Sequence, residues 1–532
     1  MRTAVPVGID ILRPPRSGYV GHYLGVFLSS PGVFLRTAVG SRYFDAAALI
    51  LLIGYLLLGA ATVSDGHRWG DDWAQYVMHS INMVEGRPYS PTGYIFNPDA
   101  PVVGPPSYPP GLPLILSPIF AITGLNLFAL KIVCFTCLVG GIFFAFKLLR
   151  ESLGIGIASA TLVLFIFHDQ IWTSRDSIQS DSPYLLVSMF ALWLAARRDD
   201  LFSDMNAVFR GALLGLLCYA AVACRYIGTT LFAAILVYGL AQRKPVSWMV
   251  GFIASFCLAL WVQSMAIVMP ATYENELVVP TFELVRDNTV GYIQALGHLF
   301  RLPLGVSVFG AMAVILLVFL GVWQASGGRS SAKSNIISVL PDVPAYVWYL
   351  AAYMCALLLV AIPPDSRYYL PVLPLIFGLA LLGIRRLVPN FSGHWLWPAV
   401  VLAAVPYYAA LHLTIPSAAP GEDATCGACQ ELYAFVRTQT PPDAVIAFAK
   451  PRAMALFTGR PSWRWSLDYA QGELGKKIEQ LGVDLLVIAD PRSPLAYLNP
   501  GSWPGLHDLG SEVFRNEMFI ALRPRGKQNA LP

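Results

Sequence analysis

Long apolar stretches recur along the first four-fifths of this chain, and they limit what it can fold into. Each has about 16 to 24 residues, which is enough for a helix to cross the hydrocarbon core of a membrane. Of the 532 residues, 56% are hydrophobic and only 13% are charged, whereas soluble globular chains carry roughly 25% charged residues. A soluble protein of this size would lack polar surface, so we expect one large membrane domain.

Taken as helices, the apolar stretches predict about eleven membrane spans in a mainly α polytopic protein. The candidate spans are Phe44–Val63, Leu125–Phe146, Gly154–Trp172, Ser182–Ala196, Ala207–Cys224, Tyr226–Ala241, Ser247–Met269, Pro303–Trp323, Val343–Ile362, Tyr369–Gly383 and Trp395–Leu413. The segment Pro109–Gly124 contains three further prolines, which disfavour a straight spanning helix, so we interpret it as interfacial or re-entrant. The first span is too long and too internal for a cleavable signal peptide and is expected to be a retained anchor.

Basic residues gather in alternate connections between these spans, and by the positive-inside rule those connections face the cytoplasm. The clusters are Arg2/Arg13/Arg16/Arg36/Arg42, Lys147/Arg150, Arg197/Arg198/Arg210, Arg243/Lys244, Arg329/Lys333 and Arg385/Arg386. The other connections then lie on the extracytoplasmic face: the loop 64–124, the loop Pro270–Leu302, the turn Pro363–Arg367 and everything after about Thr414. The net charge of +4 is small, and the basic residues are not interleaved with aromatic ones, so nucleic acid is not expected as a partner.

The charge pattern and composition divide the chain into three expected parts. Residues 1–43 form a cytoplasmic segment, residues 44–414 form the membrane domain, and residues 415–532 form a small extracytoplasmic α/β domain. In the last part charged residues are more frequent, and β-rich runs at Ala444–Ala449 and Asp484–Ala489 alternate with a helical stretch at Gln430–Thr438. Cys426 and Cys429 open it in a compartment expected to be oxidising, which favours a structural disulfide over a redox motif or a metal pair.

Two adjacent acids, Asp71 and Asp72, follow the first predicted span. They begin a predicted helix that runs to about Glu85, and Asp is favoured in a first helical turn simply because it caps free N–H groups and meets the positive end of the dipole. The alternative is chemistry at the membrane surface, where one carboxylate takes a proton and the other orients it or holds a cation. The loop of some sixty residues that carries them is long for a connection, and such loops are often functional.

Several motifs, in order, resemble the GT-C membrane glycosyltransferases, which use a sugar linked to polyprenyl phosphate. They are the acidic pair, the segment Tyr108-Pro109-Pro110, Asp181 after Ser180 at a helix start, and Arg367-Tyr368-Tyr369-Leu370-Pro371. The chain is similar to protein O-mannosyltransferases and lipid A aminoarabinose transferases. In that family the first acid of the pair is the candidate base or acceptor-orienting group, which corresponds to Asp71. The second is usually Glu, and the shorter Asp72 leaves any metal-ligand or substrate role for it open.

The reaction that this resemblance implies needs a carboxylate that faces a cation. A sugar on a lipid phosphate is already activated, so the protein must position an acceptor hydroxyl, accept its proton and neutralise the departing phosphate. The guanidinium fork of arginine suits phosphate oxygens, and the predicted outer face carries Arg68, Arg87, Arg175, Arg225, Arg286, Arg301 and Arg367.

Two of these arginines are the preferred ligands of the phosphate. Arg367 lies at a tight turn before a span, and Arg225 lies within a long apolar stretch, where an unpaired charge is costly. Interfacial snorkelling of Arg367 and a structural ion pair of Arg225 are the alternatives. Asp181 is either a helix cap or a partner for one of these arginines. Tyr108, Tyr368 and Arg87 complete the candidate substrate-binding residues.

These observations favour a glycosyltransferase that acts on the extracytoplasmic face of a membrane, expected to be the bacterial inner membrane. Its expected partners are a polyprenyl-phosphate sugar donor, membrane lipids and a lipid, glycan or protein acceptor. A divalent cation, Mg or Mn, is possible, with Asp72 as its ligand if one binds. A flippase of lipid-linked saccharide is an alternative, although transporters commonly show paired halves, and this sequence has no visible repeat. A polymerase or ligase of lipid-linked glycans is a further alternative.

Overall fold

The structure is a computed structural model, and it describes residues 31–100, 104–197, 206–268, 280–300, 304–326, 340–388, 423–466, 471–496 and 509–525, with a few isolated positions between them. Its contacts divide the chain into two compact units, Met1–Gly54 and Tyr55–Pro532. The long helix α2, Pro31–Ala60, crosses the boundary between the two units. All the contacts described below belong to the second unit.

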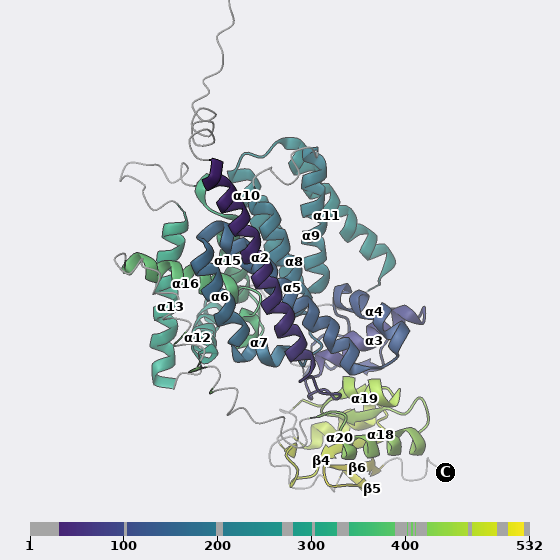
Figure 1. Cartoon of the computed structure of the whole chain (residues 1–532). Helices are drawn as coiled ribbons and strands as arrows, with labels where there is room; N and C mark the ends of the chain where they lie inside the picture. Colours follow the sequence, from purple (N-terminus) through teal and green to yellow (C-terminus); the bar gives the residue numbers. More distant parts are fainter. Residues whose placement is uncertain are drawn as a thin grey trace, which may run out of the picture. The chain divides into compact units, whose positions relative to one another are not determined.

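Helices make up most of the described chain up to residue 388 (Figure 1). After α2 they are α3 Asp72–Val84, α4 Gly111–Thr123, α5 Leu127–Leu153, α6 Ile155–Phe167, α7 Asp169–Ser174, α8 Asp181–Ala196, α9 Ala207–Cys224, α10 Thr229–Ala241, α11 Val246–Ala266, α12 Phe282–Leu299, α13 Leu304–Ala325, α15 Ala345–Leu359 and α16 Leu373–Leu387. Short 3₁₀ turns, η2 at Tyr226–Gly228 and η5 at Ser366–Tyr369, precede α10 and α16.

Five of these helices are long and apolar enough to cross a membrane, namely Tyr43–Ala60 within α2, α5, α9, α11 and Val306–Ala325 within α13. Shorter apolar helices accompany them, among them α4, α6, α8 and α15. The chain is therefore an integral membrane protein. The total of about eleven spans stays a prediction, and the predicted span Trp395–Leu413 lies almost entirely outside the described residues.

Two of the predicted connections between spans contain a helix. The Pro-rich segment before residue 124 forms α4, a helix of 13 residues with Pro118 inside it, too short to span a membrane unaided. The loop predicted at Pro270–Leu302 contains the helix α12. Its cap, Thr281, accepts a hydrogen bond from the backbone N–H of Leu284, and Asn288 donates to two carbonyls at the end of α15. Its mixed polar and apolar composition conceals this helix from a search for apolar spans.

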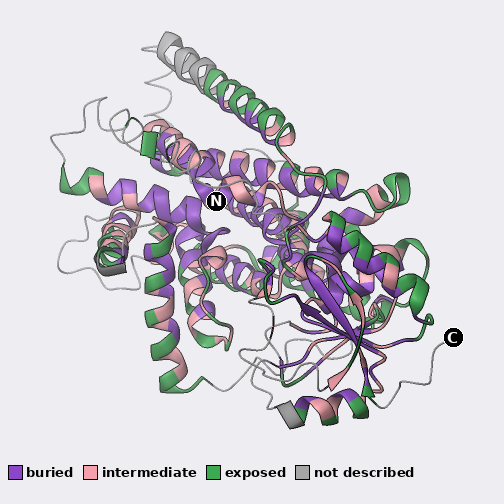
Figure 2. Ribbon diagram, turned by 90° about the horizontal axis from the view of Figure 1, so that it is seen from below, coloured by how far each residue is buried: buried purple, intermediate pink, exposed green. Residues whose placement is uncertain are grey.

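The C-terminal region, residues 423–525, contains most of a six-stranded sheet with the order β1-β3-β2-β4-β6-β5. Strand β1 is parallel to β3, which is parallel to β2, and β2 is parallel to β4, whereas β6 and β5 continue the sheet in antiparallel pairing. The elements are β2 Ile446–Phe448, β3 Ser462–Trp463, β4 Leu485–Ala489, β5 Gly510–Arg515 and β6 Phe519–Pro524, with helices α18 Gly427–Gln439, α19 Pro451–Thr458 and α20 Gln471–Gln480. The central strands are largely buried (Figure 2).

One strand of this sheet comes from the loop that follows α2. Strand β1, Tyr94–Ile95, pairs with β3. Trp69 of the same loop packs edge-on against Phe448 and Phe519 of the sheet. The sheet and the loop therefore share one hydrophobic core. The predicted domain boundary near residue 415 stays a prediction, because the residues around it lie outside the described chain.

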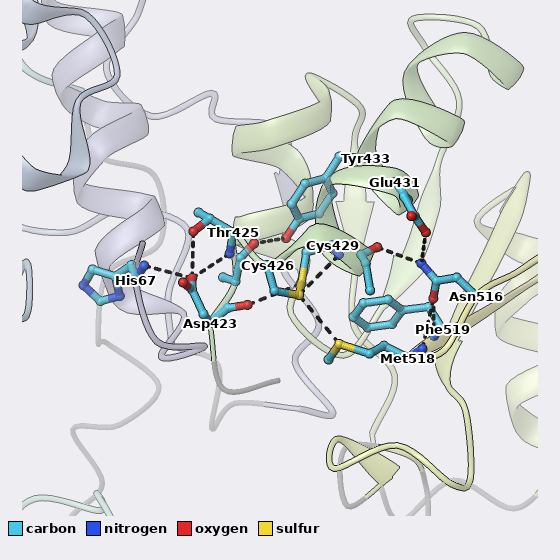
Figure 3. Close-up of a disulfide and its surroundings, with 12 residues drawn as sticks. His67, Asp423, Thr425, Cys426, Cys429, Glu431, Tyr433, Asn516, Met518 and Phe519 are labelled. Carbon is cyan, nitrogen blue, oxygen red and sulfur yellow. Dashed lines mark hydrogen bonds between the residues drawn. A yellow bond between two sulfur atoms is a disulfide. The ribbon is translucent and has the colours of Figure 1, made fainter. Parts of the chain in front are cut away.

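A disulfide lies where the C-terminal region begins (Figure 3). It joins Cys426 and Cys429, whose Cα atoms are 5.1 Å apart, as the sequence predicted. Just before it, Asp423 accepts hydrogen bonds from the backbone N–H groups of Thr425 and His67. Asp423 thus ties the start of α18 to the loop that leads into α3, and the disulfide closes the first turn of α18.

Candidate functional site

A network of buried polar contacts fixes the loop that carries the two acids. Lys131 reaches from the membrane helix α5 and donates to the Ser64 hydroxyl at 2.9 Å, to the Gly66 carbonyl and to Asp176 at 2.7 Å. Its side chain is fully buried, so the charge must be paired inside the protein. The imidazole Nε2 of His67 accepts a hydrogen bond from the backbone N–H of Ile178, and burial lowers the pKa of His67 to about 4. This histidine is therefore neutral at physiological pH.

Asp71 lies at the N-cap position of α3, yet its side chain does not cap the helix. Its Oδ1 instead accepts from the backbone N–H of Ala453, near the start of α19, at 3.4 Å. Its Oδ2 is buried and has no hydrogen-bond partner in the part of the chain that the structure describes. The capping interpretation therefore does not explain Asp71, and a buried carboxylate oxygen without a partner is an arrangement that calls for another explanation.

Asp72 faces a cluster of cations and a tyrosine. Its Oδ1 accepts from the Tyr108 hydroxyl at 2.8 Å and from Arg452 Nη1 at 3.2 Å. Its Oδ2 lies 3.4 Å from Arg367 Nη1. The Asp72 side chain is 43% exposed. Arg452 is fully buried and also donates to the Tyr108 hydroxyl and to the Pro105 carbonyl.

Asp181, the first residue of α8, holds two arginines together. Its Oδ1 is 2.6 Å from Arg225 Nη1, and its Oδ2 is 2.8 Å from both Nε and Nη2 of Arg367. The Asp181 side chain is 1% exposed, so its carboxylate is shielded from water in both ion pairs. We call Asp181, Arg225 and Arg367 the arginine–aspartate triad. Its carboxylate oxygens bind arginines, so helix capping does not account for Asp181 either.

The local backbone explains how these arginines reach one point. Arg225 interrupts the apolar run between α9 and α10 in an extended conformation, which turns its side chain out of the helical path. Arg367 lies in η5, where the Asp365 side chain accepts its backbone N–H at 2.8 Å. The Arg225 guanidinium also lies 5.8 Å from the ring centroid of Tyr368. Breaks at helix ends thus place both cations beside α3.

The two neighbouring acids have opposite pKa shifts. Burial raises the pKa of Asp71, and the nearby cations Arg452 and Lys450 offset only part of this effect. Burial also acts on Asp72, but Arg367, Arg452 and the Tyr108 hydrogen bond outweigh it, so the pKa of Asp72 is lowered. Asp72 is therefore held in its ionised form, whereas Asp71 is the more basic of the two carboxylates.

The structure brings most of the predicted site residues together. Asp72, Asp181, Arg225, Arg367, Tyr108 and Tyr368 form one connected cluster, and Asp71 adjoins it. Arg87 does not join this cluster, because the chain turns at Gly86, whose φ is +66°, and Arg87 pairs with Glu85 at a largely exposed position.

Sequence reasoning missed Arg452 of the C-terminal region. The signal that could have revealed it is its position shortly after the β-rich run Ala444–Ala449, in the first turn of α19, because residues that follow parallel strands commonly line functional sites.

The described residues do not fit a divalent cation at Asp72. Both of its carboxylate oxygens face arginines, and guanidinium groups repel a metal ion. Among the described residues no group of three or more His, Cys, Asp or Glu side chains comes together. We therefore derive no chemical step through a metal.

Comparisons with known proteins agree with this architecture. No protein-family model and no curated protein sequence matches the chain. Among solved structures, ArnT from Cupriavidus metallidurans bound to undecaprenyl phosphate has a TM-score of 0.51 at 13% identity, and the match covers 89% of this chain and 97% of ArnT. The oligosaccharyltransferase AglB from Archaeoglobus fulgidus, in complex with an inhibitory peptide and a dolichol-phosphate, has a TM-score of 0.51 at 12% identity, with 92% and 75% covered. The chain therefore has the fold of the GT-C membrane glycosyltransferases, as its sequence resemblance predicted.

Proposed function

We propose that this protein transfers a sugar from polyprenyl phosphate to an acceptor hydroxyl on the extracytoplasmic face of the plasma membrane. The observation that carries the proposal is the arginine–aspartate triad beside Asp72, in which Asp181 holds two arginines within reach of one carboxylate. The bound ligands of two proteins with this fold, undecaprenyl phosphate in ArnT and a dolichol-phosphate in AglB, support a lipid phosphate as the donor.

Arg225 and Arg367 bind the donor phosphate in this proposal. Asp181 is shared between two guanidinium groups, so the triad keeps a net positive charge. Each guanidinium also has N–H groups that do not bind Asp181 and can donate to a phosphate. The side chains are 18% and 32% exposed, so a ligand can reach them. Planar guanidinium groups bind phosphate oxygens in pairs and stabilise the negative charge that develops on the leaving group.

Asp71 is the base in this mechanism. The acceptor oxygen forms a bond with the anomeric carbon of the sugar while the bond from that carbon to the phosphate oxygen breaks. The phosphate keeps the electron pair, and the acceptor proton passes to Oδ2 of Asp71. The raised pKa of Asp71 suits this role, because a carboxylate of higher pKa is a stronger base. Asp72, held ionised, keeps Arg367 and Arg452 oriented.

A binding titration tests the donor assignment. The full chain in phosphatidylcholine nanodiscs is titrated with undecaprenyl phosphate, and the Arg225→Gln and Arg367→Gln variants are expected to bind it at least about tenfold more weakly, since hydrogen bonds to charged groups contribute roughly 1.5–3 kcal/mol each. The matched control is Arg286→Gln, because Arg286 lies at an exposed position on α12 and, among the described residues, pairs with its neighbour Asp287 alone. Equal binding by all four proteins would refute the lipid-phosphate site. Mass spectrometry of envelope lipids and glycans with and without the gene then identifies the sugar.

A further inference from the structure

The edge of the C-terminal sheet next to Asp71 carries two cations that the mechanism above does not use. Lys450 follows β2 and Arg464 follows β3, and these two strands are parallel neighbours in register. The carboxyl ends of parallel strands lie at one edge of a sheet, where open α/β sheets bind their ligands. We call Lys450 and Arg464 the sheet-edge cations.

The polar atoms at this edge are incompletely paired. Within the described chain, the side chains of Lys450 and Arg464 form no hydrogen bond or ion pair, and Arg464 Nε is buried without a partner. Arg452 Nε and Asp71 Oδ2 are buried and unpaired in the same way. Electrostatic coupling links Asp71 to all three cations, so these groups lie near one another. Unsatisfied buried polar atoms that gather from two parts of a chain indicate a ligand that supplies their partners.

Neutralisation of Asp71 does not account for this arrangement. Lys450, Arg452 and Arg464 face two carboxylates, and one of these, Asp72, is also bound to Arg367. Positive charge is therefore in excess at this edge. An anionic group would bind the cations, and a hydroxyl would donate to the free oxygen of Asp71.

We propose that the sheet-edge cations, with Arg452, bind an acidic group on the acceptor, so that the acceptor is a hydroxyl compound carrying a phosphate or carboxylate. The proposal rests on the transfer reaction proposed above and specifies its acceptor class. The donor phosphate does not compete for this site, because its polyprenyl tail stays in the membrane and the triad belongs to α8, α9 and η5 of the membrane region. The sheet-edge cations come from the C-terminal region.

The test uses the full chain in phosphatidylcholine nanodiscs saturated with undecaprenyl phosphate. Radiolabelled glycerol phosphate is the probe, measured by equilibrium dialysis. We expect saturable binding at one site, weakened about tenfold or more by Lys450→Met and by Arg464→Met. Lys476→Met and Arg437→Met are the matched controls, because Lys476 is exposed on α20 and Arg437 bonds to the Phe457 carbonyl on the surface of α18. Both controls should bind like the parent protein.

Unlabelled competitors define the chemistry of the ligand. Glycerol should not displace the probe, and displacement by glycerate would extend the site to carboxylates. Absence of saturable binding, displacement by glycerol, or equal loss in Lys450→Met and Lys476→Met overturns the proposal. Undecaprenyl phosphate binding in the same preparations separates the two hypotheses. If it persists without glycerol phosphate binding, only the acceptor inference fails, and if it is absent, the donor assignment fails.

Discussion

The membrane helices and the C-terminal sheet both contribute charged groups to the cluster around Asp72, and they differ in how completely these groups are paired. On the membrane side, Asp181 binds Arg225 and Arg367 through both carboxylate oxygens at 2.6 and 2.8 Å. On the sheet side, Lys450 and Arg464 have no ion pair among the described residues. Asp71 shares this lack of partners, since its Oδ2 is buried and unpaired.

This difference indicates that the membrane side of the site has its geometry before any ligand binds, whereas the sheet side needs a ligand to pair its charged groups. Paired and desolvated groups keep one geometry, which suits the binding of a phosphate whose position the membrane already restricts. Unpaired groups have a free-energy cost in the absence of ligand, and a substrate with complementary charge removes that cost. Arg452 joins the two parts, because it comes from α19 and binds the same carboxylate as Arg367.

The largest expected effect concerns Asp71, the acid with the unpaired oxygen beside the sheet. Asp71→Asn removes the base but keeps an oxygen that can accept from the Ala453 N–H, so folding is expected to persist. Sugar transfer should fall by about 10²–10⁴-fold, as is typical for loss of a general base. The measurement is release of undecaprenyl phosphate from its sugar-linked form, with an envelope extract as the source of acceptor. Undecaprenyl phosphate binding is the control and should be unchanged, and near-normal transfer by the variant would contradict the assignment.

The next effect concerns the membrane side and stability. Asp181→Asn leaves Arg225 and Arg367 without their buried counter-charge, and the loss of one partner from a buried ion pair costs roughly 3–5 kcal/mol. We expect a clear drop in the thermal unfolding midpoint of the detergent-solubilised protein. The comparison variant is Asp287→Asn, which breaks an exposed pair with Arg286 and should change the midpoint little. A drop no larger than in this variant would mean that the triad is not the fixed part of the site.

An intermediate effect is expected at Arg452, the residue that joins the membrane side of the site to the sheet side. Arg452→Lys keeps the charge but loses the fork that binds Asp72, Tyr108 and the Pro105 carbonyl, so transfer should fall about tenfold. Arg452→Met should reduce it further and move the acidic limb of the pH–rate profile to higher pH. The reason is that Arg452 lowers the pKa of both acids, and the base must be ionised to act.

The control for Arg452 is Arg460, at the other end of α19. Arg460 bonds to the Thr440 and Arg437 carbonyls and holds helices α18 and α19 together without contacting Asp72 in the described structure. Arg460→Lys and Arg460→Met can lower stability, but they should leave the pH–rate profile in place. A pH profile that moves equally in both series would assign Arg452 a purely structural role.

Much of the fold and most of the cluster around Asp72 could be predicted from the sequence, because charged residues are easily recognised between apolar membrane spans. Charged residues are rare in apolar stretches, so Arg225 between two apolar helices and Arg367 before another stood out as candidate ligands of a phosphate. Asp72 and Asp181 stood out in the same way at helix starts. What the sequence did not distinguish was capping from ion pairing, since both place an acid in a first helical turn. Only the positions of the arginines decide between them.

The sheet side was far harder to predict. Arg452 and Asp72 are 380 positions apart in the sequence, and nothing local relates them. Strand β1 has only two residues, which is too short for any alternation of side chains to reveal it. The pairing of β1 with β3 brings the loop and the sheet edge together, so the part of the site that depends on this pairing could not be derived from periodicity.

The smallest effect compares the two adjacent acids by the pH dependence of stability. Asp72 has a lowered pKa, so its stabilising contribution is present above the unfolded value of about 3.9 and is lost as the pH falls through the folded value. Asp72→Asn should therefore lower stability at pH 7, by at most about 1 kcal/mol because the side chain is 43% exposed, and the difference should vanish in acid.

Asp71 should behave in the opposite sense. Because its pKa is raised, the folded state binds its proton more tightly than the unfolded state does, and the ionised form costs stability at neutral pH. Asp71→Asn should raise the unfolding midpoint at pH 7, and this gain should shrink as the pH falls and the parent protein takes up the proton. Midpoints of the parent and both variants between pH 4 and pH 8 give the comparison. Two neighbouring substitutions of the same kind should thus move stability in opposite directions, and a common loss in both would show that Asp71 is an ordinary paired acid with no unpaired oxygen for a substrate.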